Sequence, residues 1–318
     1  MLETAVVVPF KGDFNSLIPT LSALQSQTIR DNLLIILSID GQEKAPSFIS
    51  ELTDVCLNGD HSGPATARNR GWRNTPAEVK FILFTDSDCI PECDWAERMI
   101  EKLKANFQAV KGVYSSGGKR LIQRLSQIEF EERYKLMSKA EQICLADTYS
   151  AGFCKNWLEK LDGFNENFPL PEHEDVDLSW RLVEHGGHIG FEAAARVEHS
   201  HRASWKAYFK TKFRRGKWRA ILIKSYPSRA VSDGYTPQTL KMQMFFSIPL
   251  VISILFVGIS IFIPISFALL FGILCLPLIV VAFNNDKSVF SFIPFFALWR
   301  GIALFTGFVI GICSKKVR

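Results

Sequence analysis

Residues 79–88 read VKFILFTDSD, an apolar run that ends in two aspartates separated by one serine. A short apolar run closed by polar residues is typical of a strand buried in a parallel sheet. Asp86 and Asp88 then stand at the carboxyl end of this strand, where their carboxylates can share a divalent cation and a ribose or diphosphate. An Asp-x-Asp triplet alone is a weak signal, because solvated turns contain many.

Two similar apolar runs precede this one, with a helical pattern between them. The runs and their closing residues are Thr4–Val8 with Pro9-Phe10-Lys11, and Leu33–Ile39 with Asp40-Gly41. The order strand, helix, strand predicts a doubly wound α/β sheet. Ligands bind such sheets beyond the carboxyl ends of the strands, so we expect the three polar strand ends to line one crevice.

The segment Gly63–Asn69 joins small residues, which allow close backbone approach, to Arg68, whose guanidinium suits phosphate. A surface arginine after a helix-entry loop is the alternative. Asp40 could accept a hydrogen bond from the N–H of a uracil or guanine base, or it could simply form a turn with Gly41. Lys11 is an ordinary solvated lysine unless the crevice forms.

Four carboxylates fall within six residues, and a helical pattern containing Arg181 follows them. They are Glu172, Glu174, Asp175 and Asp177. Acidic residues stabilise a helix N-terminus through capping and the helix dipole, which explains the cluster structurally. One of them pointing into the crevice could also act as a general base. Helical patterns are also expected at Trp95–Phe107 and at Leu121–Leu145.

His199 and His201 are one residue apart, so they face the same side of an extended strand. One of them is a candidate metal ligand, and a structural role is the alternative. The seven cysteines are odd in number and form no CxxC pair, which favours reduced thiols.

The apolar residues, 47% of the chain, concentrate towards its end. Phe245–Phe283 and Val289–Cys313 contain almost no charge, and each exceeds the roughly 20 residues that cross a bilayer. Pro264 divides the first stretch, so we expect helices at about 245–262 and 265–283, and about three transmembrane helices in all.

The net charge of +5 gathers just before these stretches. The basic residues are Lys206, Lys210, Lys212, Arg214, Arg215, Lys217, Arg219, Lys224 and Arg229. Anionic lipid explains this belt better than nucleic acid does. Four aromatic residues share a helical face with the belt, Trp205, Tyr208, Phe209 and Phe213. They predict a helix in the headgroup layer, with packing on a catalytic domain as the alternative.

The N-terminal residues do not resemble a signal peptide, so we expect the large domain on the cytoplasmic side. The basic belt and the terminal Lys315, Lys316 and Arg318 both favour that side, but three spans would separate them. Two spans or a re-entrant arrangement would remove the conflict, and the sequence does not choose.

In their order, these motifs resemble glycosyltransferase family 2, inverting enzymes of the GT-A fold, over roughly residues 4–202. The matching elements are the first strand with Pro9, then Asp40, Ala67-Arg68-Asn69, Asp86-Ser87-Asp88, Gly163-Phe164, and Glu174–Leu178 with Arg181. The resemblance implies a Rossmann-like, mostly parallel GT-A domain at 1–203. The basic belt and the apolar stretches add a basic interface neck at 204–243 and transmembrane helices at 244–318. It implies transfer of a sugar from a UDP- or GDP-sugar to a saccharide or lipid-linked acceptor hydroxyl, with Mg²⁺ or Mn²⁺, as in the synthesis of cell-envelope polysaccharide.

The resemblance also assigns roles. Asp175 is the general base, a choice over Asp177 that rests on the resemblance alone. Asp88 and His199 hold the metal, and Asp86 faces the nucleotide and is a further possible ligand. The remaining nucleotide-sugar residues are Pro9, Phe10, Lys11, Asp40, Arg68 and Gly152. Glu174, Asp177 and Arg181 support the acceptor side.

Two other functions stay open. A polyprenyl-phosphate sugar transferase would need basic residues at the membrane but no general base. A catalytically silent binding module of the same fold is a different class, and the carboxylates at every matched position argue against it. A polysaccharide synthase usually requires more membrane spans than this chain provides.

Overall fold

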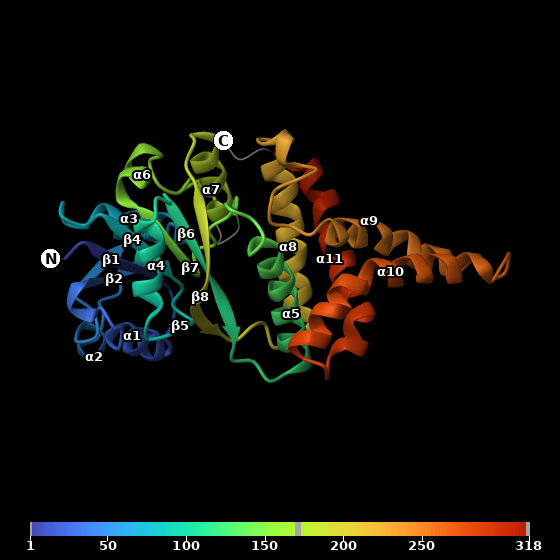
Figure 1. Ribbon diagram of the computed structural model, residues 1–318, viewed down its shortest axis with the longest axis horizontal. Helices are drawn as coiled ribbons and strands as arrows, with labels where there is room; N and C mark the ends of the chain where they lie inside the picture. The colour runs from blue at the N-terminus through green and yellow to red at the C-terminus, as the bar shows by residue number, and fades with distance from the viewer. Residues whose placement is uncertain (1, 169–172, 316–318) are drawn as a thin grey trace. The chain divides into compact units, whose positions relative to one another are not determined.

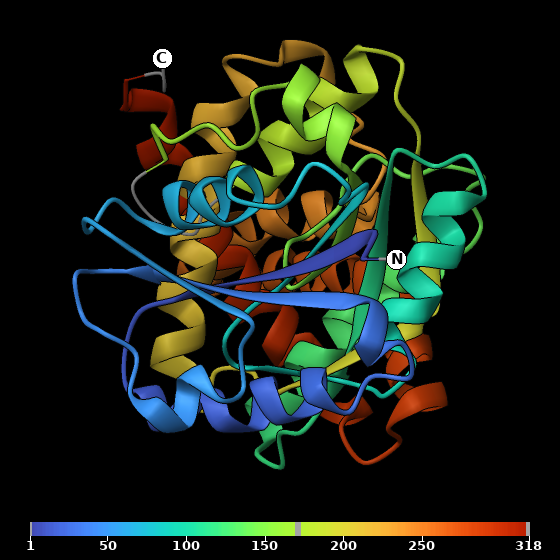
Figure 2. The ribbon, with the colours of Figure 1, turned by 90° about the vertical axis from the view of Figure 1, so that its left-hand side faces the viewer.

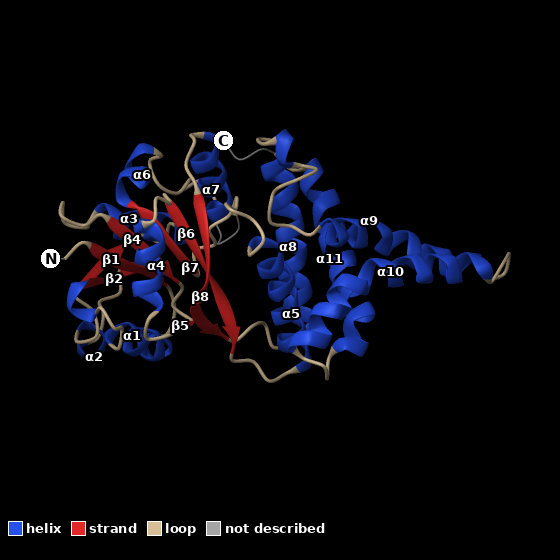
Figure 3. Cartoon of the chain, in the orientation of Figure 1, coloured by secondary structure: helices blue, strands red, loops and turns tan. Residues whose placement is uncertain are grey.

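The structure is a computed structural model that describes residues 2–168 and 173–315. Glu172, Lys316 and Arg318, named above, lie outside the described residues. The chain forms two compact units. We call them the sheet unit, Met1–Gly117 with Met137–Ser200, and the helical unit, Gly118–Leu136 with His201–Arg318. The strands belong to the sheet unit, and the helical unit is built of helices (Figure 3).

The sheet unit contains one mixed sheet of eight strands in the order β3-β2-β1-β4-β7-β6-β8-β5. The strands are β1 Thr4–Phe10, β2 Leu33–Asp40, β3 Val55–Gly59, β4 Phe81–Thr85, β5 Cys89–Pro91, β6 Ala109–Ser116, β7 Ser150–Cys154 and β8 Ile189–His199. The first four in chain order pair in parallel, and β7 then pairs antiparallel with both β4 and β6. The predicted GT-A-like α/β sheet is confirmed, and its parallel half carries β1, β2 and β4 side by side.

Helices cover both faces of this sheet (Figure 2). The sheet unit has α1 Ile18–Gln25, α2 Ser47–Ser50, α3 Pro64–Arg73, α4 Trp95–Lys104, α6 Lys155–Lys160 and α7 Glu174–Glu184. Every residue of β1 is buried, as expected for a parallel strand covered on both faces. The strand runs on through Pro9 to Phe10, although we expected Pro9 to close it. Its pairing with β4 ends at Val7, so the missing proline N–H removes no bond from that ladder.

The helical unit contains five long helices (Figure 1). They are α5 Leu121–Met137, α8 Trp205–Ile223, α9 Gln238–Ser253, α10 Phe262–Asn285 and α11 Ile293–Cys313. Residues 118–136 group with this unit, whereas the sequence placed them inside 1–203. The reason is apolar packing, because Leu125 and Ile128 of α5 join one core with Leu278 of α10 and Phe296 of α11. The helix also ends at Met137, short of the expected Leu145.

Within the part of the chain that the structure describes, three helices are long and apolar enough to cross a membrane, Gln238–Phe256, Phe262–Asn285 and Phe290–Cys313. The break between the first two comes before Pro264, which lies in the first turn of α10, where a missing N–H costs nothing. The expectation that the aromatic residues of α8 face lipid is wrong, because these residues pack on α11. Between ring centres, Tyr208 lies 5.3 Å from Phe296, and Phe209 lies 5.0 Å from Trp299.

Candidate active site

Two of the polar strand ends meet at the edge where β1 and β2 finish. Lys11 Nζ lies 3.7 Å from Asp40 Oδ2. The other oxygen of Asp40 accepts hydrogen bonds from the backbone N–H groups of Ser62, at 2.8 Å, and Gly63, at 3.0 Å. Asp40 therefore holds the loop that leads into α3, and Lys11 stands over it with its side chain 63% exposed.

Arg68 of α3 joins two distant parts of the chain. Its Nη2 donates to Asp86 Oδ1 at 2.9 Å, and its Nη1 donates to Glu174 Oε1 at 2.7 Å. The guanidinium is buried and lies 5.8 Å from the centre of the Phe164 ring. The strand end after β4 and the start of α7 are thus held to one cation.

Charge is crowded around this arginine. Burial opposes the charge of Arg68, but Asp86 and Glu174 outweigh it and raise the pKa of the guanidinium. Burial raises the pKa of Glu174 to about 7, against the pull of Arg68 and with a push from Asp175. Glu174 Oε2 is buried and has no hydrogen-bond partner among the described residues. Two carboxylates therefore share one guanidinium, and the more buried of them, Glu174, is poised to take up a proton near neutral pH.

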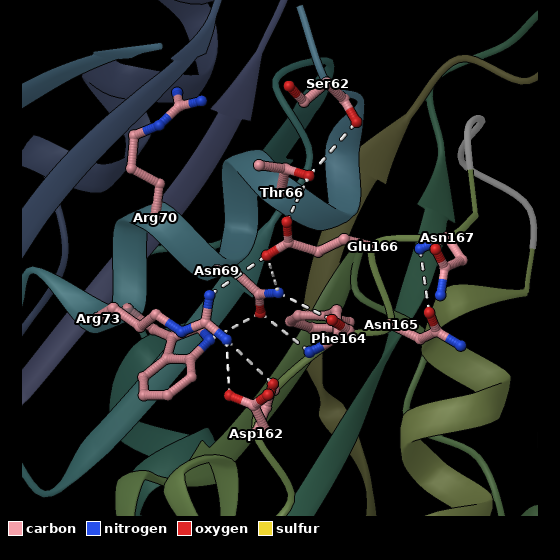
Figure 4. A network of polar contacts seen from close by, with 12 residues as sticks. Ser62, Thr66, Asn69, Arg70, Arg73, Asp162, Phe164, Asn165, Glu166 and Asn167 are labelled. Atoms are coloured by element: carbon pink, nitrogen blue, oxygen red, sulfur yellow. Dashed lines mark hydrogen bonds and ion pairs between the residues drawn. The ribbon is translucent and has the colours of Figure 1, made fainter. Parts of the chain in front are cut away.

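Asn69, the next residue on α3, fixes the loop that approaches α7 (Figure 4). Its Nδ2 donates to Phe164 O at 2.8 Å and to Glu166 Oε1 at 2.7 Å, and its Oδ1 accepts from Phe164 N at 2.9 Å. Thr66 donates to the second oxygen of Glu166 at 3.0 Å. Because α3 carries both Arg68 and Asn69, this network sets the position of Phe164 against the arginine. Glu166 is a residue that the sequence did not single out.

Helix α3 itself is pressed onto β1 at Gly71. A Cβ atom on Gly71 would overlap the side chain of Val7, so only glycine allows this approach. Arg70, on the same helix, donates to Ile39 O at 2.7 Å. The helix is thereby located against β1 and β2, and with it the guanidinium of Arg68.

A candidate metal site lies on the other side of the triplet. Asp88 Oδ1 is 3.7 Å from His199 Nδ1, and these two residues form a cluster with Cys89. The pairing of β5 with β8 places Cys89 opposite His199, and the imidazole stacks on Tyr114 at 4.8 Å. Burial, with Asp86 and Asp88 nearby, raises the pKa of the Cys89 thiol. The Asp88 carboxylate and the His199 imidazole are donors that fit Mn²⁺ or Mg²⁺.

The carboxylates in the first turn of α7 have different partners. Asp177 Oδ2 accepts from Arg181 Nε at 2.9 Å, and Arg181 also donates to Leu161 O at 2.6 Å and Gly163 O at 2.8 Å. Asp177 and Arg181 thus fasten the helix to the 161–163 turn. Asp175 is half-buried, and one of its oxygens accepts from Val176 N at 2.8 Å. His173, just before the helix, has a left-handed φ of 71°, a strained conformation for a non-glycine residue.

Some residues lie elsewhere than we expected. Gly152 is in the middle of β7, where a Cβ would lie 2.8 Å from Leu83 and 2.9 Å from Val110. It is a packing residue of the sheet core, so its expected part in nucleotide binding has no support from its position. Pro9 and Phe10 are also buried, with Phe10 against Phe14 at 5.0 Å between ring centres. Their side chains pack at the strand end.

His201 does not share a side with His199. Strand β8 ends at His199, and His201 belongs to the helical unit, where it stacks on Phe130 at 5.2 Å and lies 2.8 Å from Gln127 Oε1. The argument from an extended strand fails because the strand stops between the two histidines. Cys89, which directly follows the triplet in sequence, was missed, since only the pairing of β5 with β8 brings it beside His199.

The fold has relatives among known structures. The fold is similar to that of the mannosyltransferase PcManGT from Pyrobaculum calidifontis, solved in complex with GDP-Man and Mn²⁺. The TM-score is 0.60 at 15% sequence identity, over 98% of this chain and 87% of that one. The chain thus has the architecture of a GT-A protein with apolar C-terminal helices.

The family follows from the sequence comparison. Residues 5–165, half of the chain, match the sequence profile of glycosyl transferase family 2, and the chain belongs to this family. It is 25% identical over 239 residues to the pre-mycofactocin glycosyltransferase of two Mycobacterium tuberculosis strains. The match covers 71% of this chain and 49% of those proteins, so the chain spans about half the length of these curated relatives.

Proposed function

We propose that the chain is an inverting, metal-dependent glycosyltransferase. It moves a sugar from a UDP- or GDP-sugar to a hydroxyl of a saccharide or lipid-linked acceptor at the cytoplasmic face of a membrane. In this proposal residues 1–203 carry the catalytic domain, apart from the α5 segment, residues 204–243 form the neck, and residues 244–318 hold the protein in the bilayer.

The observation that carries the proposal is the position of Arg68. It contacts Asp86, on the side where a nucleotide diphosphate would lie, and Glu174, which directly precedes the candidate base Asp175. Asp88 with His199 lies on the far side of the same triplet. A donor held at the triplet would have positive charge near its phosphates and a carboxylate on α7 within the same unit, which is the arrangement that sugar transfer needs.

In the proposed reaction, an acceptor hydroxyl oxygen attacks the anomeric carbon of the donor as the bond from that carbon to the diphosphate oxygen breaks. The bonding electrons leave with the nucleoside diphosphate. The proton of the hydroxyl passes to Asp175. Attack opposite the leaving group inverts the anomeric centre. A divalent ion bound by Asp88 and His199 would supply positive charge to the leaving diphosphate. Arg68 keeps Asp86 and the start of α7 in place.

Asp175 suits the role of base better than Asp177 does. The Asp177 carboxylate is nearly buried and bonded to Arg181, so it is engaged in holding the helix. Asp175 is more open and lies next to Glu174. The bond between Asp177 and Arg181 supports the choice of Asp175, which the family resemblance suggested.

The proposal is tested by nucleotide release from UDP- and GDP-sugars with Mn²⁺ or Mg²⁺, with and without membrane lipid. GDP-mannose with Mn²⁺ is the first combination, because the structurally similar mannosyltransferase was solved with both. We expect metal-dependent release of one nucleotide that requires an acceptor. No release from any donor, with binding of nucleotide intact, would favour a silent binding module.

The acceptor class is tested with the Asp175→Asn variant. A hydroxyl acceptor needs its proton removed, so the variant should lose transfer while still binding donor. A polyprenyl phosphate is already an anion and needs no base. If Asp175→Asn still transfers sugar fully to polyprenyl phosphate and transfers none to saccharides, the chain is a polyprenyl-phosphate sugar transferase and the hydroxyl acceptor is rejected.

A further inference from the structure

Helices α8 and α11 run side by side in the same direction. Contacts advance together along both, from Trp205 against Phe295, at 5.2 Å between ring centres, to Lys224 Nζ, which donates to Ile312 O at 2.6 Å. Between these ends, Gly307 and Gly311 leave no room for a Cβ against the backbone oxygens of α8. Because the two backbones touch along their whole length, α8 and α11 must lie at the same angle to the membrane.

Helix α8 cannot lie in hydrocarbon. It carries seven basic residues, Lys206, Lys210, Lys212, Arg214, Arg215, Lys217 and Arg219. A lysine or arginine at the centre of a membrane helix costs roughly 2.5–3.5 kcal/mol. Since α11 lies along α8, a transmembrane α11 would take this charge into the bilayer. The apolar composition of α11 alone does not reveal this cost.

A buried ionic cluster at the middle of these helices adds to the cost. Glu129 of α5 accepts hydrogen bonds from Lys212 at 2.6 Å, Tyr208 at 2.8 Å and Arg133 at 3.0 Å. Arg300, halfway along α11 and fully buried, lies 3.8 Å from the same carboxylate. The bundle of α5, α8 and α11 is therefore held by charges at its centre, the depth where a transmembrane bundle is most apolar.

The paired helices α9 and α10 have the opposite character. No residue from Met242 to Asn285 is charged. The two helices pack together and extend crosswise to α8 and α11 (Figure 1). Their far end is the most exposed apolar part of the chain that the structure describes, with Leu255 82%, Ile259 78% and Phe262 73% exposed. A hairpin tip that emerged into water on the far side would be expected to be polar.

Four backbone N–H groups of the tip are hydrogen-bonded within it. Val257 N–H donates to Ile254 O at 3.3 Å, and Ile259 N–H and Ser260 N–H donate to Phe256 O at 2.9 and 3.0 Å. The Ser260 hydroxyl oxygen accepts from Phe262 N–H at 3.3 Å. Non-helical backbone in hydrocarbon is costly unless its polar groups are paired in this way. The tip therefore has the properties of a turn that stays inside the lipid.

We propose that the helical unit is a one-sided membrane anchor. The α9–α10 hairpin enters the hydrocarbon and turns back within it, while α5, α8 and α11 lie along the headgroup layer on the side of entry. The partner is the bilayer itself, with anionic headgroups facing the basic residues of α8. This arrangement puts the basic belt and Lys315 on the same side, which three spans would not.

Spin-label depth measurements test the anchor in the full chain, reconstituted in phosphatidylethanolamine and phosphatidylglycerol vesicles. Gly258, at the tip, and Gly272, midway along α10, both have open space where a side chain would go. Each is changed to Cys in a C93S/C313S background, which removes the exposed thiols, and carries a nitroxide. Depth is measured from the relaxation of each label by oxygen, which gathers in lipid, relative to its relaxation by a water-soluble nickel complex. In a re-entrant hairpin the label at 258 lies deeper than the label at 272. In a spanning hairpin the order is reversed, and that result would overturn the proposal.

A second measurement uses the native thiol of Cys313 and does not depend on the hairpin variants. The protein is inserted from outside into preformed vesicles, and a membrane-impermeant maleimide is added. We expect Cys313 to be labelled as fully as the exposed Cys93 of the sheet unit, each in a chain that lacks the other. Protection of Cys313 until the vesicles are opened would mean that α11 crosses the bilayer. Failure of the chain to float with the vesicles would also reject the anchor, whatever its sugar-transfer activity.

Discussion

Arg68 Nη1 lies 2.7 Å from Glu174 Oε1, and the two residues are 106 positions apart in sequence. Both side chains are buried. The contact ties α3, which follows β3 in the parallel half of the sheet, to the start of α7, where the candidate base stands. The first two predictions concern this pair.

Arg68→Met should destabilise the sheet unit by about 3–5 kcal/mol, because the buried Glu174 carboxylate loses its partner. The measurement is chemical unfolding in detergent followed by tryptophan fluorescence. Arg73→Met is the matched control on the same helix. Arg73 is 41% exposed in its ion pairs with Asp162 and Glu166, so the loss there should stay below about 1 kcal/mol. Equal losses in the two variants would contradict the inference that the Arg68 pair is a buried tie.

Glu174 should make stability depend on pH near neutrality. Its folded pKa of about 7 lies above the ordinary value of 4.5, so the folded state binds the proton more tightly than the unfolded state does. The stabilising contribution is then complete below pH 4.5 and is lost as the pH rises through about 7. We expect the apparent melting temperature to fall between about pH 5 and 8 in the parent chain and to fall less in Glu174→Gln.

The exposed Glu184, at the other end of α7, provides the control for this titration. Glu184→Gln should keep the full pH dependence of the parent chain. If Glu174→Gln and Glu184→Gln behave alike, another group is responsible for the titration.

Asp88→Asn and His199→Gln should each weaken Mn²⁺ binding by roughly tenfold or more, because each replaces one of two donors that lie 3.7 Å apart with a weaker, neutral amide. Electron paramagnetic resonance of free Mn²⁺ measures the affinity without any assay of turnover. His188→Gln, a change at an exposed histidine of the same unit, should leave the affinity unaltered. Unchanged binding in both site variants would remove this pair as the metal site.

Asp175→Asn should lower turnover by about 10²- to 10⁴-fold while donor affinity is kept, since a general base acts in the chemical step. Asp177→Asn should act mainly on stability, by about 1–3 kcal/mol, because it weakens the bond that Arg181 makes to α7. Turnover and donor binding are measured on both folded variants. Loss of turnover in Asp177→Asn alone would reverse the assignment of the base.

Local patterns were enough to predict much of the fold. The apolar runs ending at Pro9, Asp40 and the 86–88 triplet predicted strands whose polar ends meet at one edge, because burial and strand period are properties of neighbouring residues. Composition in the same way predicted three apolar helices near the end of the chain. These features depend on residues close together in sequence, so the sequence determined them.

Tertiary structure decided which of these residues meet. Arg68 with Glu174, and Asp88 with His199, are contacts between segments about a hundred residues apart, and no local period predicts them. The same holds for Gly152, which packs inside the sheet, and for the aromatic face of α8, which packs on α11 instead of lipid. An amphipathic face shows that a residue will be buried but not against what. The partner is chosen by the packing of the whole chain.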